Sequence, residues 1–252
     1  MTNPFDLTGK VALVTGGNTG IGQGIVLALA QAGASIASVA RRPSDETVGK
    51  VLALGRSAIS IQADLMSMEP IARIIAETEA GLGPVDILVN NAGIIRRADA
   101  VDFKEQDWDD VMNVNLKTVF FLSQALVKTM IAGARGGKIV NTASMLSFQG
   151  GIRVPSYTAS KSGVAGLTKL MANEWAKYGI NANAIAPGYF ATDNTQALQD
   201  DPVRSKEILG RIPAGRWGDP SDIGGAAVFL SSAAADYVQG ITLPVDGGWL
   251  AR

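Results

Sequence analysis

The sequence contains no cysteine and no histidine among its 252 residues. Without cysteine, disulfide bonds, thiolate catalysis and cysteine-based metal sites are excluded, and without histidine the common zinc ligand sets are excluded as well. We therefore predict no metal site. Histidine is also the side chain that most often moves protons near neutral pH. Any acid–base chemistry in this chain must use another residue type.

Long apolar runs and an excess of one charge are also absent. No apolar run approaches the ~18 residues needed to cross a bilayer, and the opening MTNPFDLTGK is neither apolar nor basic enough for a signal peptide. Lys and Arg number 22 against 23 Asp and Glu, so no general attraction to nucleic acid or membrane surfaces is expected. These absences predict a cytoplasmic protein without nucleic-acid or membrane partners.

The chain does contain a repeated alternation of short apolar runs with helix-length segments. Unbroken Val/Ile/Ala runs of strand length indicate a parallel sheet covered on both faces. The expected strands are 10–15, 35–40, 58–63, 85–90, 137–144, 180–186 and 240–246. The expected helices are 20–33, 44–55, 68–81, 105–132, 156–178 and 219–232, with an irregular stretch after 186. No linker or repeat divides residues 1–252, so we predict a single α/β domain with a doubly wound parallel sheet of about seven strands.

A glycine-rich turn, VTGGNTGIGQG, ends the first expected strand. Gly16 can take the positive φ of a tight turn, and Gly20 and Gly22 let a ligand approach the backbone closely. Free N–H groups at the start of the next helix favour an anion such as a pyrophosphate. The turn therefore predicts dinucleotide binding. The residues we assign to it are Gly16, Asn18, Thr19, Gly20, Ile21 and Gly22.

The end of the second expected strand bears on which dinucleotide binds. An acidic residue there binds the ribose 2′-hydroxyl of NAD, whereas a nearby Arg accommodates a 2′-phosphate. This strand ends in Ala40, Arg41 and Arg42, so no carboxylate repels a phosphate and two guanidiniums can bind one. The alternative is that both arginines face solvent. We predict a preference for NADP(H) with Arg41 as a contact, and NAD(H) stays open.

Two further loops follow strands that lie near the expected crevice. Asp64, in QADL, can accept from the adenine amino group, or it can simply begin the next helix. The NNAG turn at 90–93 lies beside the glycine-rich turn if the first and fourth strands are neighbours. The cofactor contacts we assign to these loops are Asp64, Leu65, Asn91, Ala92 and Gly93.

Tyr157 and Lys161, in YTASK, lie four residues apart and so share one face of an expected helix. A phenol near pKa 10 is a weak base at neutral pH. A positive charge about 5 Å away is worth roughly 3 kcal/mol at an effective dielectric near 20, enough to lower that pKa by about two units. Such a pair also occurs by chance on helix surfaces. Ser144, at the end of a strand, can hold a substrate oxygen beside Tyr157, and a buried Asn115 is either structural or a link that holds water near Lys161.

Taken together, the motifs resemble the short-chain dehydrogenase/reductase family over essentially the whole chain. The matching pieces are TGGNTGIG, NNAG, Asn115, Ser144, YTASK and PGYFAT. The resemblance implies a Rossmann-like fold of residues 1–252 and a homotetramer built through helices near 107–131 and 156–178, where Ala165 and Gly166 permit close approach.

The resemblance also implies a role for each matched residue. Tyr157 is the general acid/base, Ser144 orients the substrate oxygen, and Lys161 binds the nicotinamide ribose and lowers the pKa of the tyrosine. Asn115 completes a proton relay through water. The residues implied to hold the carboxamide end of the nicotinamide are Pro187, Gly188 and Thr192.

Residues 188–217 fall where this family places its substrate lid, and their polar composition favours a small hydrophilic substrate. Segments such as NNAGIIRR and IPAGRWGDPSD are similar to the sugar-acid branch of the family, which interconverts a secondary alcohol and a ketone on a deoxy-hexonate. The carboxylate of such a substrate calls for a guanidinium partner. Arg96, Arg97 and Arg153 flank the site loops, with Arg96 or Arg153 the expected partner. Gln149, with Ser144, is expected to bond substrate oxygens.

Two alternatives stay open. The first keeps the fold and changes the substrate to a 3-oxoacyl thioester or to gluconate oxidised at carbon 5. The second is a regulator that binds NADP(H) without turnover. A complete set of Asn115, Ser144, Tyr157 and Lys161 argues against the second, because a sensor has no use for a proton relay.

Overall fold

A computed structural model of the chain describes residues 3–252, apart from the side chain of residue 194. Residues 1 and 2 of the expected 1–252 unit lie outside the described residues. The strands are β1 (Val11–Thr15), β2 (Ser35–Ala40), β3 (Ala58–Gln62), β4 (Ile87–Asn90), β5 (Gly137–Thr142), β6 (Ile180–Pro187) and β7 (Thr242–Val245). They form a 7-stranded sheet in the order β3-β2-β1-β4-β5-β6-β7, with every pairing parallel. The predicted doubly wound parallel sheet is confirmed.

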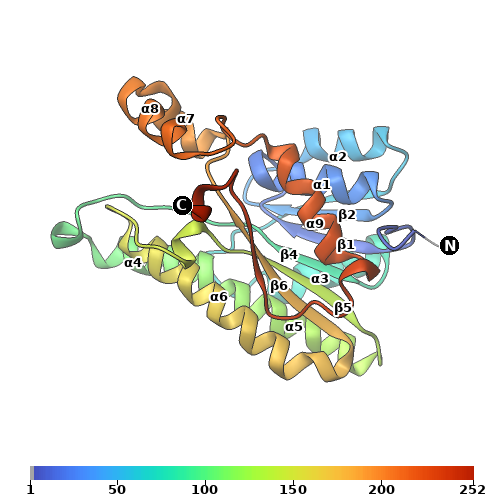
Figure 1. The fold of residues 1–252 in the computed structure, drawn as a ribbon. Helices are drawn as coiled ribbons and strands as arrows, with labels where there is room; N and C mark the ends of the chain where they lie inside the picture. The colour runs from blue at the N-terminus through green and yellow to red at the C-terminus, as the bar shows by residue number, and fades with distance from the viewer. Residues whose placement is uncertain (1–2) are drawn as a thin grey trace.

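Helices cover both faces of the sheet, as unbroken apolar strands require (Figure 1). The helices are α1 (Gly20–Gln31), α2 (Asp45–Ala53), α3 (Ile71–Leu82), α4 (Glu105–Met112), α5 (Thr118–Ala132), α6 (Pro155–Trp175), α7 (Gln196–Asp200), α8 (Pro202–Arg211) and α9 (Gly224–Ser231). One buried apolar cluster joins the sheet to α3, α5 and α6, and a second joins it to α1, α2 and α9. Among residues 3–252, no helix is both long enough and apolar enough to cross a bilayer.

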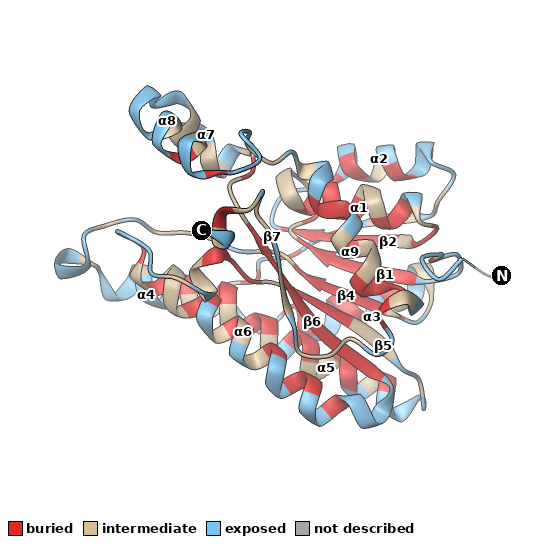
Figure 2. Cartoon of the chain, viewed as in Figure 1, coloured by how far each residue is buried: buried red, intermediate tan, exposed pale blue. Residues whose placement is uncertain are grey.

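Burial is concentrated in the central strands (Figure 2). Every residue of β1, β4 and β6 is buried, which accounts for the many apolar residues in each strand. Full burial of a Leu or Ile side chain is worth about 1.5–3 kcal/mol, so these strands make a rigid base for the loops that follow them. The α7–α8 segment, by contrast, stands clear of both helical layers and is largely exposed (Figure 2).

The strand order places a topological switch between β1 and β4. β1 pairs with β2 on one side and with β4 on the other, with Val14 opposite Val89. The connections from β1 and β4 then leave toward opposite faces of the sheet, which opens a crevice at the carboxyl edge. The glycine-rich turn and the NNAG turn both lie at this edge.

Two stretches differ from the sequence-based expectation. The helix expected over 105–132 is interrupted by a π-helical turn, Asn113–Lys117, between α4 and α5. The stretch after 186 is not irregular throughout, because it contains α7 and α8. Helix α8 begins where Asp201 accepts hydrogen bonds from the backbone N–H groups of Val203 and Arg204, with Pro202 in the first turn.

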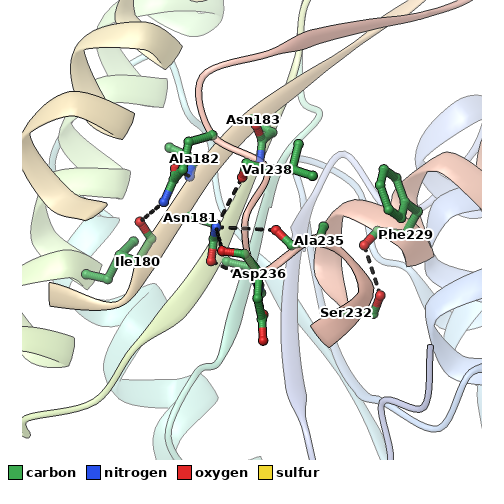
Figure 3. A network of polar contacts seen from close by, with 11 residues as sticks. Ile180, Asn181, Ala182, Asn183, Phe229, Ser232, Ala235, Asp236 and Val238 are labelled. Atoms are coloured by element: carbon green, nitrogen blue, oxygen red, sulfur yellow. Dashed lines mark hydrogen bonds and ion pairs between the residues drawn. The ribbon is translucent and has the colours of Figure 1, made fainter. Parts of the chain in front are cut away.

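A polar network fixes the segment that precedes β7, residues 235–238, to β6 (Figure 3). Nδ2 of Asn181 donates to the backbone oxygens of Asp236 at 3.0 Å and Val238 at 3.1 Å, and Nδ2 of Asn183 donates to Val238 O at 2.9 Å. Because β7 is short and only half-buried, these amides take over part of its attachment. The pairing of β7 with β6, with Pro187 opposite Val245, then brings residues 245–252 to the carboxyl edge, where the site lies.

Candidate functional site

The glycine-rich turn is shaped to receive an anion. Gly16 and Gly20 have φ values of 66° and 54°, which side-chain-bearing residues rarely adopt. A Cβ on Gly22 would lie 1.9 Å from the backbone oxygen of Gly16, so only glycine fits. No side chain caps the start of α1, and no acidic residue lies in its first turn. The N–H groups of that turn are therefore available to a pyrophosphate.

The NNAG turn is locked against the glycine-rich turn. The Asn91 side chain donates from Nδ2 to the backbone oxygens of Thr15 and Gly16, both at 3.1 Å. The Thr15 hydroxyl accepts from the N–H groups of Asn91 and Ala92 at 3.0 Å each. Asn91 therefore holds the two walls of the crevice together.

The far end of the NNAG turn reaches Asn115 and Lys161. A Cβ on Gly93 would lie 3.3 Å from Oδ1 of Asn115 and 3.8 Å from Nζ of Lys161. A Cβ on Gly20, at the other end of the crevice, would lie 3.3 Å from Cγ2 of Thr192. The predicted phosphate, NNAG and Thr192 positions thus line one continuous edge.

The adenine end of the crevice is held by small polar contacts. Arg41 and Arg42 are exposed directly after β2, and the backbone oxygen of Arg41 accepts from Nε2 of Gln62 at 3.0 Å. Asp64 is exposed, and its Oδ1 accepts from Met66 N at 3.0 Å. This contact closes a local turn, and α3 begins only at Ile71, so the helix-start role that the sequence left open for Asp64 is not found. The backbone oxygen of the buried Leu65 accepts from the Thr118 hydroxyl.

Tyr157 and Lys161 lie on the first turns of α6 and face the same crevice. Nζ of Lys161 is 5.7 Å from the centroid of the Tyr157 ring and donates to Thr142 O at 2.5 Å. Lys161 is 4% exposed, so its charge is largely removed from water. Burial lowers the pKa of Lys161 to about 8.

Ser144 lies at the end of β5, next to Tyr157. Its hydroxyl accepts from Leu146 N at 3.2 Å, and the residue is 8% exposed. Burial raises the pKa of Tyr157, while hydrogen bonding from Ser144 and the positive charge of Arg97 lower it. The ammonium of Lys161 is not among these influences, so the lowering that the sequence predicted from it is not found in the chain alone.

Of the three arginines that the sequence offered as partners for a substrate carboxylate, Arg97 was favoured less than Arg96 or Arg153. None of the ion pairs within residues 3–252 involves Arg97. Arg96 instead contacts Asp107 at 3.3 Å and Asp110 at 3.2 Å, and Arg153 contacts Asp99 at 3.0 Å. Two of the three guanidiniums are therefore already paired, which sequence spacing alone could not reveal.

Asn115 sits inside the π-helical turn and is fully buried. Its Oδ1 accepts from Ile94 N at 2.8 Å, and its Nδ2 donates to Ile94 O at 2.9 Å and to the Ser160 hydroxyl at 3.3 Å. The side chain thus clamps the loop that carries Arg97 against α6. The predicted water relay through Asn115 stays a prediction.

The remaining predicted positions gather where β6 ends and the lid segment begins. Gly188 N donates to Val245 O at 2.9 Å, and a Cβ on Gly188 would lie 2.6 Å from Cα of Asp246. This tight crossing fixes Pro187 and Gly188 beside β7. Oε1 of Gln149 accepts from Nη2 of Arg211 and Nε1 of Trp249, both at 3.3 Å. Gln149 therefore lies between the Ser144 loop and the lid segment.

Comparison with known proteins agrees with this geometry. The family model for short chain dehydrogenases matches residues 10–203. The chain is 63% identical over 248 residues to 2-dehydro-3-deoxy-D-gluconate 5-dehydrogenase of Escherichia coli (strain K12), which covers 98% of each chain. It is 61% identical over 250 residues to the enzyme of the same name from Dickeya dadantii (strain 3937), covering 99% of each.

A solved structure gives the same result in three dimensions. It is of an Agrobacterium tumefaciens protein assigned as a 2-deoxy-D-gluconate 3-dehydrogenase, with bound NADP. The TM-score is 0.94 at 62% identity, and 100% of each chain is covered. These matches agree with the crevice and with the cluster of Ser144, Tyr157 and Lys161. The chain therefore belongs to the short-chain dehydrogenase family, whose members are oxidoreductases that act on CH–OH groups.

Proposed function

We propose that the protein interconverts a secondary alcohol and a ketone on a deoxy-hexonate sugar acid, with NADP(H) as cofactor. The main support for this substrate is the 63% identity, over nearly the whole chain, to an enzyme named for 2-dehydro-3-deoxy-D-gluconate. The polar lid segment and the positive charge of Arg97, which acts on Tyr157, fit a small anionic substrate.

The residues of the crevice fit a dinucleotide. The glycine-rich turn, with no side chain hydrogen-bonded to the start of α1, would hold the pyrophosphate, and Asp64, Leu65, Asn91 and Ala92 would line the adenosine side. Lys161, Pro187, Gly188 and Thr192 would hold the nicotinamide end. When bound, the cofactor supplies or accepts a hydride at the substrate carbon.

The protein's own side chains move the proton and hold the substrate. In reduction the Tyr157 hydroxyl gives its proton to the carbonyl oxygen, and in oxidation the phenolate takes it from the alcohol. The Ser144 hydroxyl donates to the same oxygen and fixes its position. Because burial raises the pKa of Tyr157, the protonated form is the resting one. Arg97 supplies positive charge that stabilises the phenolate when the proton leaves, and the same effect expected of Lys161 stays a prediction.

The preference for NADP(H) rests on the end of β2. Arg41 and Arg42 are exposed there, with Ala40 in place of a carboxylate, and the A. tumefaciens neighbour carries NADP. NAD(H) is the alternative. A titration of each reduced cofactor, followed by quenching of intrinsic fluorescence, tests the preference, and tighter binding of NADH would contradict it.

Turnover with a panel of substrates tests the reaction itself. We expect reduced-cofactor absorbance to change with deoxy-hexonates and not with 3-oxoacyl thioesters, and faster with deoxy-hexonates than with gluconate. Tyr157→Phe should abolish turnover and leave cofactor affinity nearly unchanged. A wild type that binds cofactor but turns over no member of the panel would instead support the regulator alternative.

We further infer that residues 188–217 act as the substrate lid and that four copies assemble. The exposed large apolar residues on the outer faces of α5 and α6 include Phe121 at 39% and Leu170 at 40%, which fits the family's helix-to-helix contact. The predicted substrate roles of Arg96, Arg153 and Gln149, and the cytoplasmic location, stay predictions.

A further inference from the structure

The lid helix α8 is attached to the rest of the protein by a set of contacts at its C-terminal end. Four side chains take part, and we call them the lid clamp. They are Gln149, Arg211, Trp249 and Arg252. They come from the loop after Ser144, from α8 itself and from residues 249–252, so segments far apart in the sequence meet at one point.

Arg252 binds the end of α8 directly. Its Nη2 donates to Gly210 O at 2.6 Å, and its Nε donates to Arg211 O at 3.2 Å. The last carbonyls of a helix have no partner within the helix, and they lie at the negative end of its dipole. The Arg252 guanidinium donates to two of these carbonyls, and its positive charge is favourable at the negative end of the helix dipole.

Trp249 and Arg211 make the second connection. The guanidinium carbon of Arg211 lies 4.1 Å from the centroid of the Trp249 ring, a cation–π contact. Trp249 is 5% exposed and packs in a buried cluster with Ile208 and Ile212 at the end of the lid and with Met145 next to Ser144. The lid is thus held both by charge and by apolar packing.

The segment that carries Trp249 and Arg252 is itself built to approach the lid closely. Asp246 accepts from the N–H groups of Gly248 and Leu250, both at 2.9 Å, which fixes the turn. Gly248 has a φ of 92°, and a Cβ there would lie 2.9 Å from Cγ of Pro213, just past α8. Only glycine allows this approach.

Gln149 connects the clamp to the catalytic loop. One oxygen, Oε1, accepts from both Arg211 and Trp249, and the backbone N–H of Gln149 donates to Met145 O at 3.1 Å. Met145 follows Ser144, so a change in the position of α8 is passed to the residue that orients the substrate oxygen. Within residues 3–252 nothing accepts from Nε2 of Gln149, which leaves that group free for the substrate.

We propose that Gln149, Trp249 and Arg252 are positioning residues that hold α8 against the Ser144 loop and thereby determine how tightly the sugar acid binds. The proposal rests on the sugar-acid reaction and the lid role proposed above. None of these residues need touch the reacting atoms. Trp249 and Arg252 act through α8, and Gln149 acts through α8 by its Oε1. Their loss is therefore expected to change KM for the sugar acid far more than kcat or the affinity for NADP(H).

The test compares Arg252→Ala with Arg204→Ala in the full-length protein. Arg204 lies on the same lid helix, but its ion pair, at 2.8 Å, is with Glu207 of that helix, so it is a matched control outside the clamp. We expect Arg252→Ala to raise KM for the deoxy-hexonate about tenfold, equivalent to the loss of two modest hydrogen bonds, with kcat and the dissociation constant of NADPH within about twofold of wild type. Arg204→Ala should match wild type, and Arg252→Lys, which keeps one donor to a carbonyl, should fall between.

Hydrogen exchange of α8 gives a second readout, one that needs no turnover. The amides of residues 203–211 should exchange faster in Arg252→Ala than in wild type or Arg204→Ala. Unchanged KM together with unchanged exchange would overturn the proposal, as would equal effects of the two alanine variants. If the wild type turns over no sugar acid, the proposed function fails, whereas the exchange comparison still decides whether Arg252 holds the lid.

Discussion

At the scale of single residues, the proposed site depends on the Lys161 ammonium, whose burial in the fold costs free energy. Lys161 is 4% exposed, and its ammonium donates a hydrogen bond to Thr142 O. Burial disfavours its charged form, yet the proposed binding of the nicotinamide ribose and the proposed action on Tyr157 both call for that charge. The residue is thus a place where stability is given up for function.

We predict that this cost shrinks at alkaline pH. The pKa of Lys161 is about 8 in the folded chain against an ordinary value of 10.5. Below pH 8 both the folded and the unfolded chain carry the Lys161 proton, so the full cost of burying the charge remains. Between pH 8 and 10.5 only the unfolded chain keeps this proton, so folding becomes more favourable as pH rises. The gap corresponds to about 3 kcal/mol.

Lys161→Met removes the titration and so isolates this effect. Urea unfolding at several pH values should show wild type gaining up to about 3 kcal/mol relative to Lys161→Met between pH 8 and 10.5. Any constant loss from leaving Thr142 O unpaired cancels in that comparison. Parallel stability curves for the two proteins over this range would show that the ammonium is not destabilised by burial.

Arg97 is the second residue for which we make a prediction. Its charge lowers the pKa of Tyr157, so Arg97→Ala should raise that pKa and move the alkaline-favoured oxidation rate to higher pH. Arg97→Lys keeps the charge and should stay near wild type. Arg153→Ala, whose guanidinium is paired with Asp99 at 3.0 Å, is the comparison. If Arg153→Ala moves the pH–rate profile as far as Arg97→Ala, the assignment is wrong.

At the scale of elements, the main surprise is the π-helical turn between α4 and α5. The apolar pattern of 105–132 runs on with little visible break, because one extra residue in a turn shifts the helix face without removing apolar residues. The sequence could therefore predict a helix here but not its interruption. The turn places Asn115 where both ends of its amide reach Ile94.

Loss of that amide should destabilise the element. Asn115→Leu leaves the N–H and C=O of Ile94 without their partner in a buried place, which should lower the free energy of unfolding by roughly 2–4 kcal/mol. Asn113→Ala changes the same π-helical turn at a partly exposed position and should cost less than about 1 kcal/mol. Urea denaturation of both variants checks this, and equal losses would mean that the clamp on Ile94 contributes little.

In residues 188–217 the sequence failed in the opposite way, because it did not predict a helix that is present. Its Asp201–Pro202 start is a recognisable helix signal, but α8 buries only Ile208, so its apolar periodicity is too weak to predict a helix. The ion pairs of Arg96 and Arg153 were equally hidden, because they depend on how α4 and two loops lie relative to one another. Sequence predicts elements that bury a face; it does not predict the partners of exposed charges.

At the scale of the whole molecule, the alternation of strands and helices was enough to predict the site's location. Parallel strands bring all their carboxyl ends to one edge, so Gly16, Asn91, Ser144 and Pro187 had to meet there once β1 and β4 became neighbours. The crossover rule left few topologies without fixing the strand order, and the structure makes β1 and β4 neighbours. Assembly of several chains, by contrast, depends on exposed faces that one chain alone does not use.

Gly166 offers a direct test of that assembly. It is exposed on α6, and a Cβ there would meet nothing within 4 Å in its own chain, so Gly166→Arg is compatible with the folded subunit and improves helix propensity. If subunits pack through α5 and α6, a long charged side chain at this position must be buried without a partner or must separate them. Sedimentation velocity should show a tetramer for wild type and smaller species for Gly166→Arg. Gly49→Arg on α2, where a Cβ also meets nothing within 4 Å, should remain a tetramer; a Gly166→Arg protein that sediments like wild type would place the contact elsewhere on the surface.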